Sequence, residues 1–262
     1  MTLPARRRGQ TATIRGMTQE LFRADGYLRE CEATVQAVEA GGVVLDRTVF
    51  YPLGGGQAGD SGALVLEDGA LLAVADTRKA KDAEGRPTVG IWHVPAPGQE
   101  ALLASLRPGQ KVVARIDWDR RHRLMRFHTT THLLCHLVPR LVNGCSITPE
   151  YARLDFDMTE PLDKDELSAG IARLVAAAHP VAVGSITDEE LDANPSLVKS
   201  MSVQPPRGTG RIRTIRIGGE QLVDYQPCGG THVAHTGEIG AVVVTKIEKK
   251  SATTRRVVLG FA

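Results

Sequence analysis

Two pairs of metal-type side chains, far apart in the chain, place the strongest constraint on its fold. His128 and His132 lie in a segment whose pattern predicts a helix from about residue 120 to 142. Side chains four apart on a helix project from one face, so two imidazoles can reach one divalent ion at ~2.0–2.1 Å. The second pair, Cys228 and His232, brackets two glycines and a threonine. If the four form one site, the fold must pack this later turn against the helix.

A set of one cysteine and three histidines suits Zn²⁺, because imidazole and thiolate are borderline-soft ligands. Four protein ligands usually indicate a closed structural site, whereas a catalytic zinc keeps a position for water. Both interpretations remain open. No glutamate follows His128, so the pattern is not the His-Glu-x-x-His arrangement of metalloproteases. Without that glutamate, the general base of a catalytic site must be a metal-bound hydroxide or a group of the substrate. Zinc would lower the pKa of its water toward ~7 and so supply a nucleophile at neutral pH.

Two neighbours of the histidine pair compete for a role. Cys135 lies three residues after His132 and is expected to pack or to line a pocket. His136 is too far along the helix, about 12 Å from His128, to share its metal. We expect His136 to be packed in the core or to contact a ligand residue.

The first part of the chain reads as short strands separated by turns, which predicts a small antiparallel β-barrel or sandwich without an intervening helix. The expected strands are residues 33–38, 43–51, 63–66, 71–75, 89–94 and 111–118. A glycine-rich stretch at 52–62 interrupts them. It is neither a P-loop nor a dinucleotide-binding turn, because no Gly-Lys-Ser/Thr and no helix follow. It is either a flexible connection or a loop whose backbone approaches a ligand.

The second part mixes helices and strands, which predicts an α+β unit with helices on one face of an antiparallel sheet. Asp117 or Asp119 can cap the histidine helix, and Asp163 with Glu166 resembles a capping box. Expected strands are 151–157, 181–186, 211–217, 240–248 and 255–259, and further helices are 163–178 and 187–193. We therefore expect three parts: a basic, disordered extension (1–16), a β-barrel domain (17–117) and a zinc-binding domain (118–262).

Composition limits the location and the partners. No apolar run is long enough to span a membrane, no secretory signal is present, and the four cysteines are unevenly placed, which favours the reducing cytoplasm. The sequence does not give the oligomeric state, and a monomer is the expectation. The net charge of +2 neither requires nor excludes nucleic acid. Basic residues nevertheless cluster, which favours a phosphate-bearing partner over a merely solvated face. The clusters are Arg120, Arg121, Arg123 and Arg126; Arg207, Arg211, Arg213 and Arg216; and Lys246, Lys249, Lys250, Arg255 and Arg256.

These motifs together resemble the alanyl-tRNA editing family, which comprises the editing domain of alanyl-tRNA synthetase and freestanding AlaX-type proteins. The family pairs a His-x-x-x-His helix with a Cys-Gly-Gly-Thr-His motif, and both are intact here. Further family-like segments occur from about residue 17 to 259, including the glycine-rich run 54–62, Thr148-Pro149-Glu150 and Thr236-Gly237-Glu238. Cys135 is a departure, since relatives often carry histidine at that position. No adenylation domain precedes these motifs, so the resemblance implies a freestanding editor.

The resemblance implies one zinc ion held by His128, His132, Cys228 and His232. The substrate would be tRNA(Ala) mischarged with serine or glycine, and the reaction would be hydrolysis of the aminoacyl ester. A barrel like those of translation factors would precede the editing core. Candidate contacts to the serine hydroxyl are Thr129, Thr130, Thr131, Ser146, Thr148 and Gln226, with the backbones of Gly54, Gly55 and Gly56 close to the substrate. Arg211 and Arg213 are candidate tRNA contacts.

Two other functions remain open. The protein could be a tRNA- or RNA-binding module in which zinc is purely structural and chelation unfolds the chain. It could also hydrolyse small esters, although the basic clusters argue against a substrate without phosphate groups.

Overall fold

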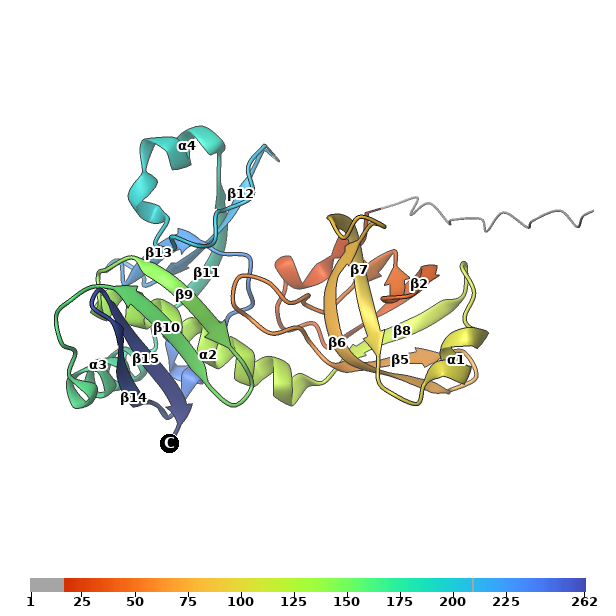
Figure 1. Cartoon of the computed structure of the whole chain (residues 1–262), viewed down its shortest axis with the longest axis horizontal. Coiled ribbons are helices and arrows are strands. Elements are labelled where there is room, and N and C mark those ends of the chain that lie inside the picture. Colours follow the sequence, from red (N-terminus) through yellow and green to blue (C-terminus); the bar gives the residue numbers. More distant parts are fainter. Residues whose placement is uncertain (1–16, 209) are drawn as a thin grey trace, which may run out of the picture.

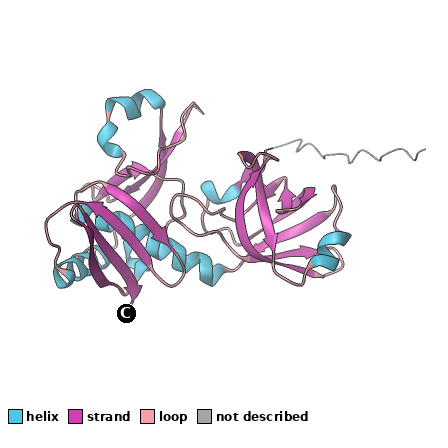
Figure 2. Cartoon of the chain, in the orientation of Figure 1, coloured by secondary structure: helices cyan, strands magenta, loops and turns pink. Residues whose placement is uncertain are grey.

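The computed structural model describes residues 17–208 and 210–262, and the expected extension 1–16 lies outside them. Two lobes follow one another along the chain, an N-terminal barrel and a C-terminal lobe that mixes sheets and helices (Figures 1 and 2). The long helix α2 (Trp118–Leu137) starts beside the barrel and runs into the C-terminal lobe. Within the described residues, no helix has both the length and the hydropathy needed to cross a membrane.

Six antiparallel strands form a closed barrel in the order β2-β3-β7-β6-β5-β8. Inward-facing side chains such as Val35, Leu64 and Leu72 alternate with exposed ones and fill the interior. The strands are β2 (Glu30–Glu39), β3 (Gly42–Leu45), β5 (Gly62–Leu66), β6 (Leu71–Lys81), β7 (Pro87–Pro95) and β8 (Lys111–Ile116).

The barrel region departs from expectation in two places. The single strand expected at 43–51 is interrupted, because the chain leaves the barrel after β3 and forms β4 (Arg47–Thr48), which pairs with β1 (Gln19–Glu20). A short helix, α1 (Glu100–Ser105), lies between β7 and β8, where none was expected. The 3-10 helix η1 (Leu21–Arg23) precedes the barrel, and its buried Phe22 packs with Tyr51 and with Ile91 of β7.

The C-terminal lobe packs helices α2 and α3 (Lys164–Ala176) against a four-stranded antiparallel sheet of order β14-β15-β10-β9. Phe127 of α2, Phe156 of β10 and Leu259 of β15 belong to its continuous apolar core. The strands are β9 (Val142–Ile147), β10 (Ala152–Asp157), β14 (Val242–Ser251) and β15 (Thr254–Phe261).

A second, three-stranded sheet of order β11-β12-β13 carries the turn that ends in His232. Its strands are β11 (Val181–Ile186), β12 (Ile212–Ile217) and β13 (Asp224–Pro227). Helix α4 (Asp188–Ala193) and 3-10 helix η2 (Pro195–Leu197) lie between β11 and β12, and η3 (Thr236–Ile239) follows the turn. Because β13 ends at Pro227, the chain turns away from the sheet just before Cys228.

Helix caps match the sequence in part. Asp117 caps α2 by accepting from the Arg120 backbone N–H, and Asp163 caps α3 in the same way. The reciprocal bonds of a capping box are found at α4 instead, between Thr187 and Glu190. Helix α2 ends at Leu137 rather than near residue 142, because the chain continues into β9, a strand that the sequence pattern did not predict.

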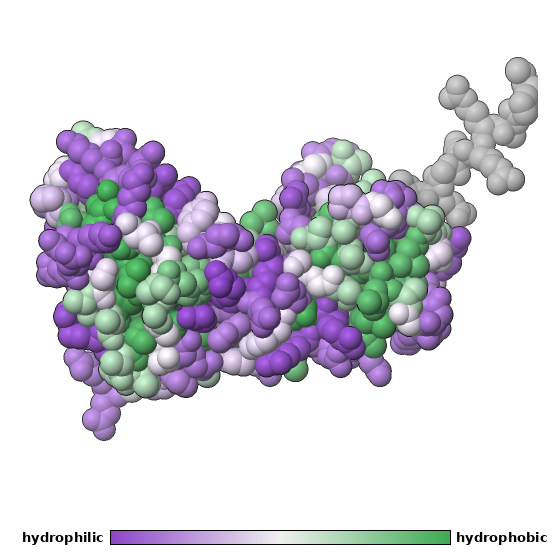
Figure 3. All heavy atoms as spheres, turned by 90° about the horizontal axis from the view of Figure 1, so that it is seen from below, coloured by the Kyte–Doolittle hydropathy of each residue, from purple (hydrophilic) through white to green (hydrophobic). Residues whose placement is uncertain are grey.

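The two lobes are joined by the glycine-rich segment and by the start of α2. Ala58 N–H donates to Ile147 O (2.9 Å) and Ile147 N–H to Gly56 O (2.7 Å), so this segment adds an edge to β9 and is not a flexible connection. Arg121 was expected in a basic surface cluster, but it is fully buried against Asp60. On the face shown in Figure 3, hydrophilic residues gather over this junction.

The expected class, a mixed α and β protein with antiparallel sheets, is confirmed. The likeness of the barrel to those of translation factors stays a prediction.

Candidate metal centre

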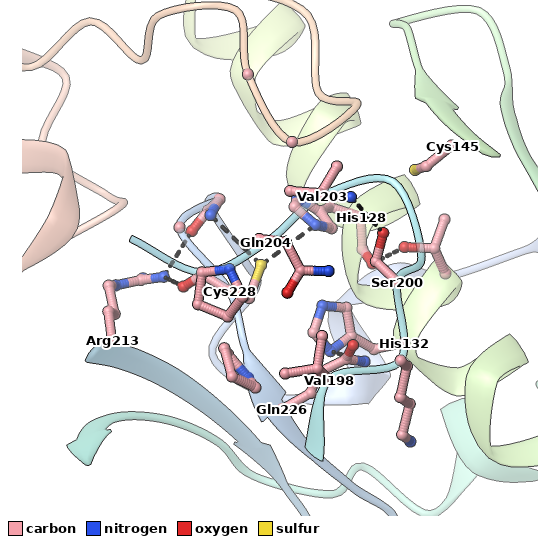
Figure 4. A pocket seen from close by; sticks show the side chains of 18 of the residues that line it. His128, His132, Cys145, Val198, Ser200, Val203, Gln204, Arg213, Gln226 and Cys228 are labelled. Carbon is pink, nitrogen blue, oxygen red and sulfur yellow. Dashed lines mark hydrogen bonds between the residues drawn. The ribbon is translucent and has the colours of Figure 1, made fainter. Parts of the chain in front are cut away.

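Helix α2 and the turn after β13 bring the four expected ligand residues together. The ligand atoms of His128, His132, Cys228 and His232 all lie within 4.8 Å of one another. The Cys228 sulfur is 3.4 Å from Nε2 of His128 (Figure 4). It is also 3.3 Å from Nε2 of His232. His128 and His132 are buried because α2 passes through the core, and His232 is buried in the turn that packs against it. A cluster of this composition could hold a metal ion.

The first ligand ring, His128, is oriented by a residue of the other lobe. Its Nδ1 lies 2.7 Å from Oε1 of Gln57, which is fully buried in the glycine-rich segment. The same oxygen accepts from the Thr231 backbone N–H (3.1 Å), and Gln57 Nε2 donates to the Thr231 hydroxyl (2.9 Å). An amide oxygen only accepts, so His128 carries its proton on Nδ1 and presents Nε2 to the cluster.

The second ligand ring, His132, is held by a carboxylate. Its Nδ1 lies 2.7 Å from Oδ2 of Asp224 at the start of β13. Gln226 Nε2 donates to the same oxygen (2.8 Å), and Lys199 pairs with the other oxygen. Burial favours the neutral carboxyl, but the bond from His132 and the charges of His132 and Lys199 lower the pKa of Asp224 to about 2. Asp224 therefore stays ionised and fixes His132 with Nε2 facing the cluster.

The third ligand ring, His232, is held by Thr129, one residue after His128 on α2. The Thr129 hydroxyl donates to Met125 O (2.9 Å), so it has only acceptor capacity left. It accepts from the Val233 backbone N–H (3.2 Å) and lies 3.2 Å from Nδ1 of His232. His232 is therefore also protonated on Nδ1.

All three rings thus have the arrangement typical of metal-bound histidine, in which the outer nitrogen donates to a protein group and the inner one is left for the ion. Burial raises the pKa of the Cys228 thiol, but the charges of His128 and His232 outweigh it and bring the pKa well below its ordinary value. Burial and the charge of His128 lower the pKa of His232. His132 differs, because burial lowers its pKa but the bonds to Asp224 and Cys228 raise it to about 9, so a metal would have to displace a proton from this ring. The cluster favours the thiolate that a metal requires, and its donor set fits Zn²⁺.

Gln57 was not among the candidate residues, although it lies within the glycine-rich stretch, directly after Gly56. We predict that Gln57→Ala weakens Zn²⁺ binding by about tenfold to 100-fold, the usual cost of losing a group that orients a ligand. Titration against a chromogenic chelator measures the affinity. The matched control is Gln221→Ala, since Gln221 is exposed and away from the cluster. Equal affinities for the two variants would contradict an orienting role for Gln57.

A cavity of about 320 Å³ opens beside the cluster and is lined by His128, His132 and Cys228. It contains four of the expected substrate residues: Thr131, Gln226, Gly54 and Gly55. The other expected substrate contacts do not line it. Gly56 packs against Cys145, Ser146 lies on β9, Thr148 holds the turn before Tyr151, and the hydroxyls of Thr129 and Thr130 bond to α2 carbonyls.

The two neighbours of the histidine pair, Cys135 and His136, have different surroundings. Cys135 lines the cavity, and burial raises the pKa of its thiol to about 12, so it stays protonated. His136 is exposed, so the expectation that it would be packed or touch a ligand residue is wrong.

The two candidate tRNA-binding arginines have different surroundings. Arg211 is exposed and donates to the Ser185 hydroxyl (2.7 Å). Arg213 lines the cavity and donates to the backbone carbonyls of Arg23, Cys228 and Gly230.

Fold and site together define a class of protein in which a β-barrel lobe is packed on an α+β lobe with a buried Cys/His₃ cluster. Comparison with family models gives two matches. Residues 212–258 match the model described as "Threonyl and Alanyl tRNA synthetase second additional domain". Residues 17–120 match the model described as "tRNA synthetases class II (A)".

Two editing proteins match over nearly their whole length, whereas an alanine–tRNA ligase matches over a quarter of its length. The alanyl-tRNA editing protein AlaX-M of Saccharolobus solfataricus is 35% identical, over 92% of this chain and 98% of the relative. That of Methanosarcina mazei is 34% identical, over 92% of this chain and 95% of the relative. The alanine–tRNA ligase of Metallosphaera sedula is 35% identical over 88% of this chain, but only 25% of the ligase is covered. The chain belongs to the AlaX-M family of alanyl-tRNA editing proteins.

Proposed function

We propose that the protein hydrolyses the ester bond of tRNA(Ala) mischarged with serine or glycine, and so edits in trans. The observation that carries this proposal is the meeting of four ligand atoms within 4.8 Å beside an open cavity. The names of the relatives, which are alanyl-tRNA editing proteins, support the choice of substrate. A synthetase discriminates poorly against one added hydroxyl, so a second, hydrolytic site has a physical purpose.

The metal would be Zn²⁺, held by His128, His132, Cys228 and His232, because this donor set matches its preferences. When bound, it would supply Lewis-acid stabilisation of charge on the ester. Gln57, Asp224 and Thr129 fix the three rings, so the donor atoms do not have to reorganise during a reaction.

The cavity also has groups suited to a serine hydroxyl. The Thr131 hydroxyl donates to His128 O (2.7 Å), so its lone pairs can accept from a substrate. Gln226 is held through its Nε2 on Asp224, so its amide oxygen is an available acceptor at a fixed place. Apolar Leu154 and protonated Cys135 line the same cavity and limit the entry of bulk water. A substrate that fills the cavity is thereby desolvated beside the cluster.

The test is a panel of deacylation rates with seryl-, glycyl- and alanyl-tRNA(Ala). We expect seryl- or glycyl-tRNA to be hydrolysed at least about tenfold faster than alanyl-tRNA, within the range that one hydrogen-bonded group supplies. His132→Ala and chelation should both lower the faster rate. His136→Ala, an exposed residue on the same helix, is the control. Equal rates for wild type and His132→Ala would contradict a role for the cluster in hydrolysis.

A second candidate is a tRNA-binding module with a structural zinc. It is favoured by one observation, that protein groups supply four ligands and thus complete a tetrahedral shell. This function predicts that chelation unfolds the C-terminal lobe and that tRNA binds in a salt-dependent manner without turnover.

The remaining assignments are proposals of the same kind. We assign tRNA contact to Arg211, since it is exposed on the lobe that carries the cavity. We propose a barrel domain (17–117) followed by a zinc-binding domain (118–262). We also propose that the protein is a monomer and that it acts in the cytoplasm.

A further inference from the structure

The turn from Cys228 to His232 must be stiff if it is to hold two metal ligands. It contains Gly229 and Gly230, and glycine has the largest backbone freedom of any residue. Its carbonyls also lack strand partners, because β13 ends at Pro227. A turn of this kind needs other donors to fix it.

Arg213 of β12 supplies these donors. Its guanidinium nitrogen Nη1 donates to Cys228 O (2.6 Å) and to Gly230 O (3.0 Å). Figure 4 shows Arg213 next to Cys228. In the opposite direction, the Cys228 backbone N–H donates to Arg213 O (3.1 Å). The ligand-bearing turn is thus tied to β12 through both the backbone and the side chain of one residue.

The same side chain also reaches the N-terminal lobe. Its Nε donates to the carbonyl of Arg23, at the end of η1 (3.1 Å). Three carbonyls from two separate segments therefore meet one planar guanidinium, whose fork of fixed donors lysine cannot reproduce.

We propose that Arg213 is a positioning residue for the metal centre, which sets the conformation of the Cys228–His232 turn, and that it is not a tRNA contact. The proposal rests on the proposed binding of metal by the cluster, but not on hydrolysis. Its Nε and Nη1 both donate to backbone carbonyls, so the guanidinium cannot offer the pair of neighbouring nitrogens that a bidentate phosphate contact requires.

The test measures Zn²⁺ affinity by chelator competition and the thiolate-to-cobalt absorption of the Co²⁺-loaded protein. We expect Arg213→Met to weaken Zn²⁺ binding by about tenfold to 100-fold and to change the cobalt spectrum. The Zn²⁺ affinity of Arg213→Lys should lie between those of Arg213→Met and wild type. The control is Arg216→Met on the same strand, because the Arg216 side chain donates to Gly219 O in a local turn. Both of its readouts should match wild type.

Binding of uncharged tRNA at two salt concentrations provides the opposing outcome. If Arg213→Lys and Arg213→Met keep wild-type metal affinity and cobalt spectrum but bind tRNA more weakly with a smaller salt slope, the proposal is overturned. Circular dichroism checks that each variant is folded. If Arg213→Met does not fold, the metal affinity and tRNA binding of Arg213→Lys decide between the two outcomes. Failure of wild type itself to bind Zn²⁺ or Co²⁺ would overturn the proposed metal site, and with it this role for Arg213.

Discussion

Gly230→Ala is expected to lower the affinity for Zn²⁺ by at least about 100-fold, the cost of displacing a site group by ~1 Å. A Cβ atom at position 230 would lie 2.1 Å from Cε1 and 2.4 Å from Nδ1 of His128, and 2.9 Å from Oε1 of Gln57. The His128 ring cannot move aside without leaving Gln57, and the turn cannot move without taking Cys228 with it. Because the surroundings are closely packed, the added methyl group must displace either the His128 ring or the turn.

Gly229→Ala is the matched control, because it adds the same methyl group one residue earlier. Its Cβ would meet only the end of the Arg23 side chain, at 3.1 Å, and Gly229 is exposed. We expect Gly229→Ala to keep Zn²⁺ affinity within about threefold, as a surface change of ±0.5 kcal/mol would. Chelator competition on both variants measures the contrast. Wild-type affinity in Gly230→Ala would show that the turn can adopt a second conformation that still binds metal.

Asp60→Asn is expected to destabilise the fold by about 3–5 kcal/mol, the usual cost of leaving a buried charge without its partner. Asp60 and Arg121 are both fully buried, with 0% of either side chain exposed. Arg121 Nε lies 3.0 Å from Oδ1 of Asp60, and its other donors reach Gly26 O and Val49 O. The pair therefore connects the start of α2 to the barrel, and its loss leaves the guanidinium ionised in the interior.

Urea unfolding of Asp60→Asn measures this effect as a lower midpoint. Glu30→Gln is the control, because it removes one partner of the exposed Arg115–Glu30 pair, whose side chains are 55% and 54% exposed. That change should cost no more than about 1 kcal/mol. If both variants unfold at the same urea concentration, the Arg121–Asp60 pair does not hold the lobes together.

The sequence was most informative where a pattern is local. The expected strands of the barrel lie within a few residues of β2, β5, β7 and β8, because alternation of apolar residues is a property of each strand alone. The start of α2 was also predicted, because a helix cap is local too: Asp117 accepts from the N–H of Arg120, three residues later. Strands β9 and β13 were not predicted, because both lack clear alternation and depend on their neighbours in the sheets.

Sequence alone determined which side chains can bind metal and that His128 and His132 share one helix face, because helical geometry fixes positions four residues apart. Tertiary structure decided what orients them. Gln57 is 71 residues from His128, and Asp224 is 92 residues from His132, so these contacts exist only through the packing of the lobes and sheets. The tertiary structure also decided the surroundings of Arg213, which the sequence offered as a phosphate contact. Its side chain donates to carbonyls of the Cys228–His232 turn and of Arg23, and these carbonyls come together only in the fold.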